Sequence, residues 1–222
     1  MDRWAAALGV EDPALVVARD LTTGAQVRAT ADFYRLNWIG EHRGDDPGFA
    51  PLLERYGPRA YALTVEPDPA EAARWRALAQ LPPGSLGRAL ADFYSARGFG
   101  WPGELGAANA DLAHHDWVHL IAGYDTVPIG ELEVTAFMAA ASRDPGAMVG
   151  FLGAVSIYET GLLASVVVPP TLTHTLSAPG AVERVLAAIR RGDRCAVDPL
   201  LGVDYFQMAA EPLEEVRRSW GL

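Results

Sequence analysis

Apolar residues recur at helical spacing along most of the 222-residue chain, and the segments that carry them are separated by proline or glycine. The alternation typical of half-buried strands does not set the pattern. The sequence therefore predicts an all-α protein. With ends placed to within a few residues, the expected helices cover residues 13–20, 26–38, 69–79, 84–97, 106–122, 131–143, 147–164, 180–191 and 212–219.

Two of the expected helices carry their own start signals. Asp68 and Pro69 precede the run AEAARW, and Pro212 lies at the start of EPLEEVRR, which has acids in its first turn and arginines in its last. No low-complexity linker divides the chain, and its length suits one large domain. We therefore expect a single-domain helical bundle over residues 1–222.

Residues 146–170 form the one stretch for which a membrane span could be argued, because Glu159 is its only formal charge. The glycines, the central glutamate and the closing prolines favour a buried core helix instead, since a charge at mid-bilayer depth is costly. The N-terminus has early acidic residues and no long apolar run, unlike a secretory signal or a transit peptide. We expect a protein of the bacterial cytoplasm.

One heptapeptide is nearly repeated. RATADFY at residues 28–34 and RALADFY at residues 88–94 differ at a single position. The residues that follow Gly40 and Gly100 do not align, whereas repeat architectures keep their period over long stretches. The repeated heptapeptide is better explained by two helices with similar faces, or by chance, than by a duplicated structural unit.

The charge and the composition of the chain exclude several classes of partner and of catalytic site. The net charge of −10 and the pI near 4.9 argue against a nucleic-acid partner, which needs a basic face. All 18 cationic side chains are arginines, so a lysine Schiff base and a P-loop lysine are excluded. Cys195 is the single cysteine, which excludes an internal disulfide and a thiolate metal cage and fits a reducing compartment. It has no adjacent histidine, so we interpret it as incidental.

Three of the five histidines fall within HHDWVHLIAGYDTVPIGE, residues 114–131. If residues 106–122 are helical, successive side chains turn by about 100°, so His115 and His119 lie about 40° apart on adjacent turns with Asp116 in the same arc. The spacing predicts one helix face that carries two ring nitrogens and a carboxylate.

Glu131 cannot join that face on the same straight helix, where it would lie about 18 Å further along the axis. Gly123, Pro128 and Gly130 allow a turn, after which Glu131 would begin the next helix and point back at the first. Two imidazoles with one or two carboxylates suit Zn, Fe(II), Mn or Co, and the lack of thiolates disfavours a purely structural zinc. The plainer alternative is that the histidines satisfy local hydrogen bonds and that Glu131 caps its own helix.

Two other chemistries use similar motifs. HDWVH resembles the HExxH of zinc peptidases, but its aspartate is too short to reach a metal-bound water in the same way. The adjacent histidine and aspartate also resemble the centre of HD phosphohydrolases, for which His42 and Asp144 would have to supply the remaining ligands. That interpretation leaves His119 and Glu131 unexplained, and the lysine-free chain offers no clear phosphate clamp.

The spacing HDxxHx(11)E resembles the motif of the Coq-four family of ubiquinone (coenzyme Q) biosynthesis, and here it is formed by His115, Asp116, His119 and Glu131. LPPGSLGRALADFY at residues 81–94 is similar to the family's LPxGTLG segment and the aromatic-bearing helix after it. GELEVTAF and the C-terminal PLEEVR are also similar to family segments. The resemblance covers residues 76–222, whereas residues 1–75 match only in helical character.

The resemblance implies an all-α homodimer that binds a divalent metal, Zn or Fe(II), through His115, His119 and Glu131, with Asp116 as a fourth ligand or an orienting partner. It also implies a polyprenylated aromatic or other prenyl lipid in an apolar tunnel, at the inner face of the cytoplasmic membrane. The expected activity is metal-dependent removal of the C1 carboxylate of a polyprenylated hydroxybenzoate, with hydroxylation if the metal is redox-active. The alternative is a non-catalytic lipid-binding scaffold for other quinone biosynthetic enzymes.

Candidate wall residues of such a tunnel are Phe137, Met138, Phe151 and Leu152, although ordinary core packing explains the same apolar residues. Arg88, at the start of its helix, is a candidate partner for a head-group carboxylate or phosphate.

The remaining polar residues near the motif have lesser roles. Tyr124 and Asp125, in the connecting loop, could exchange a proton, although stabilising the loop is the plainer role. His114 is turned about 100° from His115, which places it beside the site rather than in it. His174 has no visible partner in the sequence.

Overall fold

Every regular element is a helix within residues 12–44, 46–167 and 173–222, the part of the chain that this computed structural model describes. The α-helices are α2 (Pro13–Thr22), α3 (Gln26–Leu36), α4 (Trp38–Arg43), α5 (Phe49–Tyr56), α6 (Arg59–Ala62), α7 (Pro69–Arg76), α8 (Leu86–Arg97), α9 (Ala110–Ala122), α10 (Pro128–Ala141), α11 (Pro145–Val155), α12 (Ala181–Asp193) and α13 (Leu213–Ser219). Helical turns of other types are η1 (Ala77–Gln80), η2 (Ser156–Thr160) and η3 (Thr175–Ser177). The prediction of an all-α, single-domain fold is confirmed.

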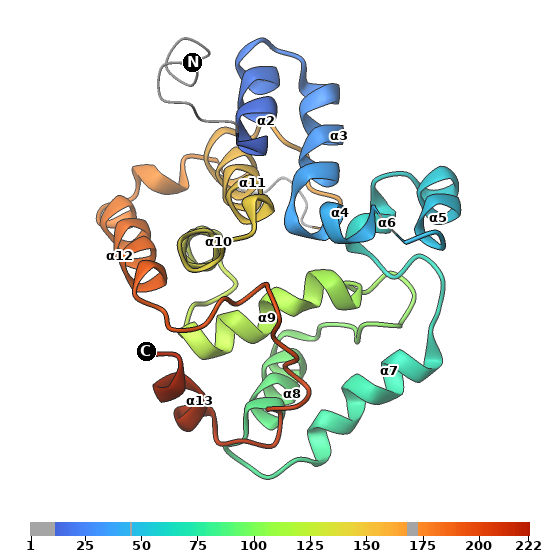
Figure 1. Cartoon of the computed structure of the whole chain (residues 1–222), viewed down its shortest axis with the longest axis vertical. Helices are drawn as coiled ribbons and strands as arrows, with labels where there is room; N and C mark the ends of the chain where they lie inside the picture. The colour runs from blue at the N-terminus through green and yellow to red at the C-terminus, as the bar shows by residue number, and fades with distance from the viewer. Residues whose placement is uncertain (1–11, 45, 168–172) are drawn as a thin grey trace.

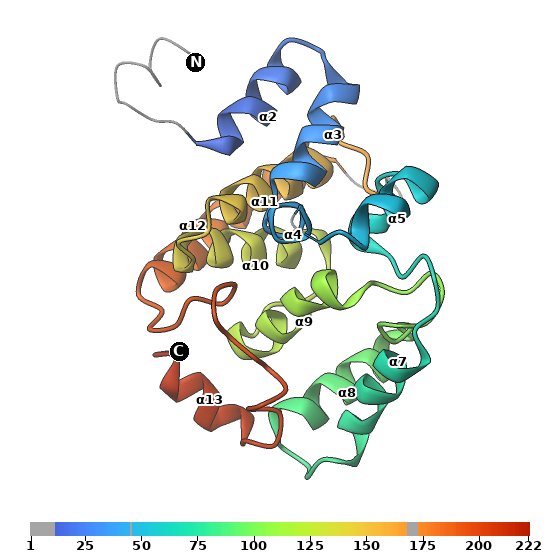
Figure 2. The same cartoon turned by 45° about the vertical axis from the view of Figure 1, so that its right-hand side comes forward.

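The helices are stacked along the long axis of the molecule. From top to bottom of Figure 1, α11, α10, α9 and α8 follow one another, with α2 and α3 against α11 and with α12 beside α10. The order is the same when the molecule is turned (Figure 2). The helices α9 and α10, which carry the histidines and Glu131, therefore lie in the middle of the stack.

The apolar pattern does not predict α4, α5 and α6. These helices contain 6, 8 and 4 residues, which is too short for a 3.6-residue period to stand out. Glycine and proline separate them, so the segment has the composition of a loop.

The helix predicted over residues 147–164 is two elements, which corrects that prediction. α11 ends at Val155, a π-helical turn follows as η2, and Gly161 ends the run with a left-handed φ of 65°. No proline interrupts the sequence around Val155, so nothing local marks the point where the hydrogen-bond pattern widens. No helix among the described residues is long and apolar enough to cross a bilayer. Residues 168–170, the end of the apolar stretch, lie outside the described residues.

Side-chain hydrogen bonds connect both ends of α9 to other helices. Asn109 caps its N-terminus and also donates to the carbonyl of Tyr61 at 3.0 Å, which joins α9 to α6. At the other end, Arg191 of α12 and Arg217 of α13 donate to carbonyls of the last turn at 2.9 and 2.8 Å. Cationic donors satisfy carbonyls that have no partner within the helix. The histidines of α9 are thus carried on a helix held in place at both ends.

Candidate metal site

One face of α9 gathers three groups that could ligate a metal. His115, Asp116 and His119 each offer a ligand atom, and these atoms all lie within 4.8 Å of one another. The helix begins at Ala110 rather than at residue 106, but the His115–Asp116–His119 stretch is helical as expected, so the i, i+4 spacing places the two rings on adjacent turns. Their centroids are 5.1 Å apart.

Glu131 reaches the same face from α10. Its two carboxylate oxygens lie 3.7 Å from Nε2 of His115 and 3.5 Å from Nε2 of His119. The reversal of the chain depends on Gly123, which ends α9 with φ 77°, and on Pro128, which begins α10 three residues earlier than predicted. Glu131 consequently lies in the first turn of α10 rather than at its first residue.

Both imidazoles are oriented by backbone carbonyls through their δ nitrogens. Nδ1 of His119 lies 3.2 Å from the carbonyl oxygen of Tyr124, and Nδ1 of His115 contacts the carbonyl of Leu112. The ε nitrogens are therefore directed at Glu131. Metal-bound histidines are oriented in this way by a second hydrogen bond.

The ε nitrogen of His119 is buried and has no hydrogen-bond partner among the described residues. Buried polar atoms in proteins are nearly always hydrogen-bonded, and this nitrogen has only the ion-pair contact with Glu131 at 3.5 Å, so an ion between the two groups would satisfy it better. A divalent cation would satisfy it and would suit the group formed by His115, Asp116 and His119, with Glu131 lying near the two ring nitrogens. The residues present thus fit a metal ion.

The charges in the site are strongly coupled. Burial lowers the pKa of His115, but the Asp116 and Glu131 carboxylates raise it more, to about 9. Burial raises the pKa of Glu131, but His119 and His115 lower it further, to about 2. Without metal, the site holds a protonated imidazole beside an ionised carboxylate, and a bound cation would take over the role of that proton.

The other residues suggested for chemistry lie outside the cluster. Nε2 of His42 is 3.1 Å from Asp144, so the two extra ligands of an HD phosphohydrolase pair with each other and neither belongs to the group of ligand atoms described above. His114 turns away, with Nε2 3.0 Å from the carbonyl oxygen of Pro199. Asp125 pairs with Arg97 at 2.7 Å, as suits a loop-stabilising role.

The head-group candidate Arg88 lies on α8, where its Nε donates to Asp92 one turn later at 2.9 Å. The tunnel candidates divide into two pairs. Phe137 and Met138 are 0 and 2 % exposed in the main core, whereas Phe151 and Leu152 are partly exposed on α11. None of these four residues lines the pocket at the start of α10 or the pocket beside Trp75 and Tyr205, so the tunnel stays a prediction.

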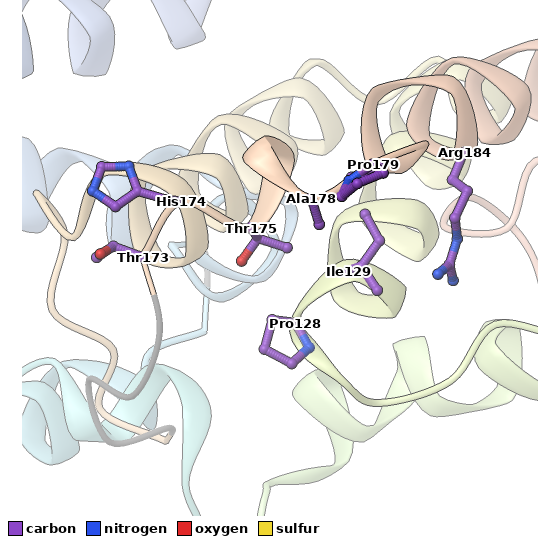
Figure 3. Close-up of a pocket in the computed structure, with 9 residues that line it drawn as sticks. Pro128, Ile129, Thr173, His174, Thr175, Ala178, Pro179 and Arg184 are labelled. Carbon is purple, nitrogen blue, oxygen red and sulfur yellow. The ribbon is translucent and has the colours of Figure 1, made fainter.

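One of these pockets opens at the start of α10, close in sequence to Glu131. It has a volume of about 320 Å³, and Figure 3 shows Pro128 and Ile129 on one side, His174 at one end and Arg184 at the other. Arg184 forms two hydrogen bonds, of 2.9 and 2.6 Å, to Glu133, which is 6 % exposed. Sequence patterns do not predict this pair, because Glu133 lies in an apolar helix and its partner is 51 residues away.

Tyr94 is the residue next to the cluster that the sequence analysis missed. Its hydroxyl is 2.6 Å from an oxygen of Asp116. The tyrosine belongs to the repeated heptapeptide, but nothing in that pattern connects it with Asp116, which lies 22 residues further along on another helix.

No protein-family model and no curated protein match the sequence. A crystal structure from Nostoc punctiforme PCC 73102 does match the fold. It is of a protein provisionally described as a ubiquinone biosynthesis protein. The match covers 95 % of this chain and 97 % of that one, with 19 % sequence identity and a TM-score of 0.50. At this identity, the likeness supports a shared fold over nearly the whole chain.

Proposed function

We propose that this chain is a metal-dependent enzyme of ubiquinone-type quinone biosynthesis, which removes the C1 carboxylate of a polyprenylated hydroxybenzoate. The main observation in favour of a metal is the buried Nε2 of His119, which has no hydrogen bond within the described residues and faces a Glu131 oxygen at 3.5 Å. The sequence motif and the description of the structural neighbour both support the pathway.

In this proposal His115, His119 and Glu131 would hold a divalent ion, and Asp116 would add one carboxylate oxygen. When bound, the ion would supply a Lewis acid for the substrate's carboxylate or phenolic oxygen. Decarboxylation would break the bond between C1 and the carboxylate carbon, carbon dioxide would depart, and the electron pair left at C1 would take up a proton from solvent. Hydroxylation at the same carbon would need molecular oxygen, a two-electron donor and a redox-active ion, for which two histidines and a carboxylate suit Fe(II).

The protein's own contribution is to keep these groups oriented and partly dehydrated. The side chains of His115 and Glu131 are 17 and 18 % exposed, and that of His119 is fully buried. Charges act more strongly in such a site than in water, because fewer solvent dipoles screen them.

A prenyl-lipid-binding scaffold without catalysis is the second candidate. The pocket beside the start of α10 favours it, since much of its lining is aliphatic or proline (Figure 3). A scaffold needs the lipid site but tolerates the loss of a metal ligand, and this difference separates the two candidates.

Metal analysis of the protein purified without chelator tests the proposal. We expect near-stoichiometric metal in the wild type and a loss of it in Glu131→Ala and His119→Ala. Asp125→Ala is the matched control, because it removes a carboxylate that is outside the cluster and pairs with Arg97. Circular dichroism would establish that each variant is folded.

Two results would contradict the proposed enzyme activity. One is a folded wild type that takes up no divalent ion even after reloading. The other is unchanged quinone synthesis by Glu131→Ala in cells that depend on this protein, which would favour the scaffold.

A further inference from the structure

Tyr94 lies on α8 with its ring fixed among other aromatic side chains. The residue is 1 % exposed. Its ring stacks on Trp101 with centroids 5.0 Å apart, meets Phe99 edge-on at 5.7 Å and lies 6.2 Å from Trp75. Such packing leaves the hydroxyl one position, and that position is beside α9.

The hydroxyl is 2.6 Å from Oδ2 of Asp116, at the short end of the range for a hydroxyl bonded to a carboxylate. The phenol O–H of Tyr94 donates, and the carboxylate of Asp116 accepts.

The two oxygens of Asp116 consequently differ. Oδ2 is engaged by the tyrosine, whereas Oδ1 faces the cluster, 3.5 Å from Nε2 of His115. The aspartate side chain is only 9 % exposed, so water competes little for either oxygen. A carboxylate held in this way presents one oxygen to an ion rather than two.

We propose that Tyr94 is a positioning residue, which holds Asp116 so that Oδ1 alone enters the ligand set. This inference depends on the proposed metal site. It adds that the geometry of the site is set from α8, a helix that contributes no ligand. Hydrogen bonds from outside the ligand shell orient ligands, and their loss typically weakens metal binding by about 10–100-fold.

Cobalt(II) binding to the full chain tests this inference, because Co(II) suits the same ligands as Zn(II) and its visible absorption reports coordination geometry. We expect Tyr94→Phe to bind Co(II) about 10-fold to 100-fold more weakly than the wild type, with a changed visible spectrum. The matched control is Tyr205→Phe. Tyr205 is 2 % exposed and its hydroxyl donates to the carbonyl of Pro199 at 2.9 Å, so this variant also loses one buried hydrogen bond. It should keep the wild-type affinity and spectrum.

The double variant Tyr94→Phe/Asp116→Asn supplies a second test, which applies even if Tyr94→Phe alone does not fold. Tyr94→Phe leaves a buried charge without its donor, whereas the double variant Tyr94→Phe/Asp116→Asn carries a neutral amide at this position and has no charge to desolvate. If Tyr94 acts through Asp116, the double variant should bind Co(II) no more weakly than Asp116→Asn alone.

The outcomes separate the two proposals. Wild-type affinity and spectrum in Tyr94→Phe, or losses that simply add in the double variant, would overturn the positioning role while the metal site stands. Failure of the wild type to bind Co(II) would overturn the metal site and the positioning role together. An absence of decarboxylation in a protein that shows the expected Co(II) results would count against the activity alone.

Discussion

Residues 28–34 and 88–94 carry the heptapeptides RATADFY and RALADFY, and both fold into helices, α3 and α8. Each ends in a buried tyrosine. The hydroxyl of Tyr34 accepts a hydrogen bond from the backbone N–H of Val166 at 3.1 Å, whereas the hydroxyl of Tyr94 donates to Asp116. The same side chain therefore holds a backbone segment in one place and a candidate metal ligand in the other.

The phenylalanines before these tyrosines differ in the same way. Phe33 packs so closely on α11 that a Cβ at Gly153 would lie 1.9 Å from its ring. Phe93 is buried in the main core, with its ring centroid 6.2 Å from that of His119. Near-identical local sequences thus acquire a structural or a site-related role from the helix that packs against them.

The two heptapeptides differ only at Thr30 and Leu90, and exchanging these residues should give the largest difference in the free energy of unfolding. Leu90 is fully buried in the main core, whereas Thr30 is half-buried and donates to a carbonyl of its own helix. Leu90→Thr should lower the free energy of unfolding by about 3 kcal/mol, since it creates a cavity and buries a hydroxyl. Thr30→Leu should change it by less than about 0.5 kcal/mol. Urea unfolding of both variants measures the contrast, and similar losses would mean that the two heptapeptides are equivalent after all.

The proximity of His115, His119 and Glu131 could be predicted because it depends on local rules. Helical periodicity aligns the histidines, and glycine and proline reverse the chain between α9 and α10. The bond from Tyr94 to Asp116 could not be predicted, because it depends on how α8 packs against α9. Tertiary packing of that kind leaves no periodic trace in one sequence. The π-turn of η2 was not predicted for a related reason, since no proline around Val155 marks the change in hydrogen-bond pattern.

Replacing Tyr34 tests whether the two tyrosines have different roles. Tyr34→Phe removes the acceptor of the Val166 N–H and should lower the free energy of unfolding by about 1.5 kcal/mol. Co(II) affinity should stay at the wild-type value, because Tyr34 belongs to the second, smaller core, with Phe49 and Tyr61. The measurement pairs urea unfolding with a Co(II) titration. A loss of affinity like that expected for Tyr94→Phe would show that buried tyrosines affect the site through general stability.

Replacing the arginines that begin the two heptapeptides should give the smallest difference in the free energy of unfolding. Arg28 reaches Asp20 of α2 with two hydrogen bonds, of 3.1 and 2.8 Å, and Asp20 is only 7 % exposed. Arg28→Ala should lower the free energy of unfolding by about 1 kcal/mol, because a mostly buried carboxylate loses its partner while water still reaches the exposed side of the pair.

Arg88 pairs within its own helix with Asp92, whose side chain is 65 % exposed, so Arg88→Ala should cost only about 0.3 kcal/mol. Because the expected loss of stability is small, Arg88→Ala can test whether Arg88 binds the head group of a lipid. A loss of binding to an anionic prenyl lipid by this variant could not be attributed to a weakened fold. If Arg88→Ala instead destabilised the protein as much as Arg28→Ala does, the contrast between a pair that joins two helices and a pair within one helix would fail.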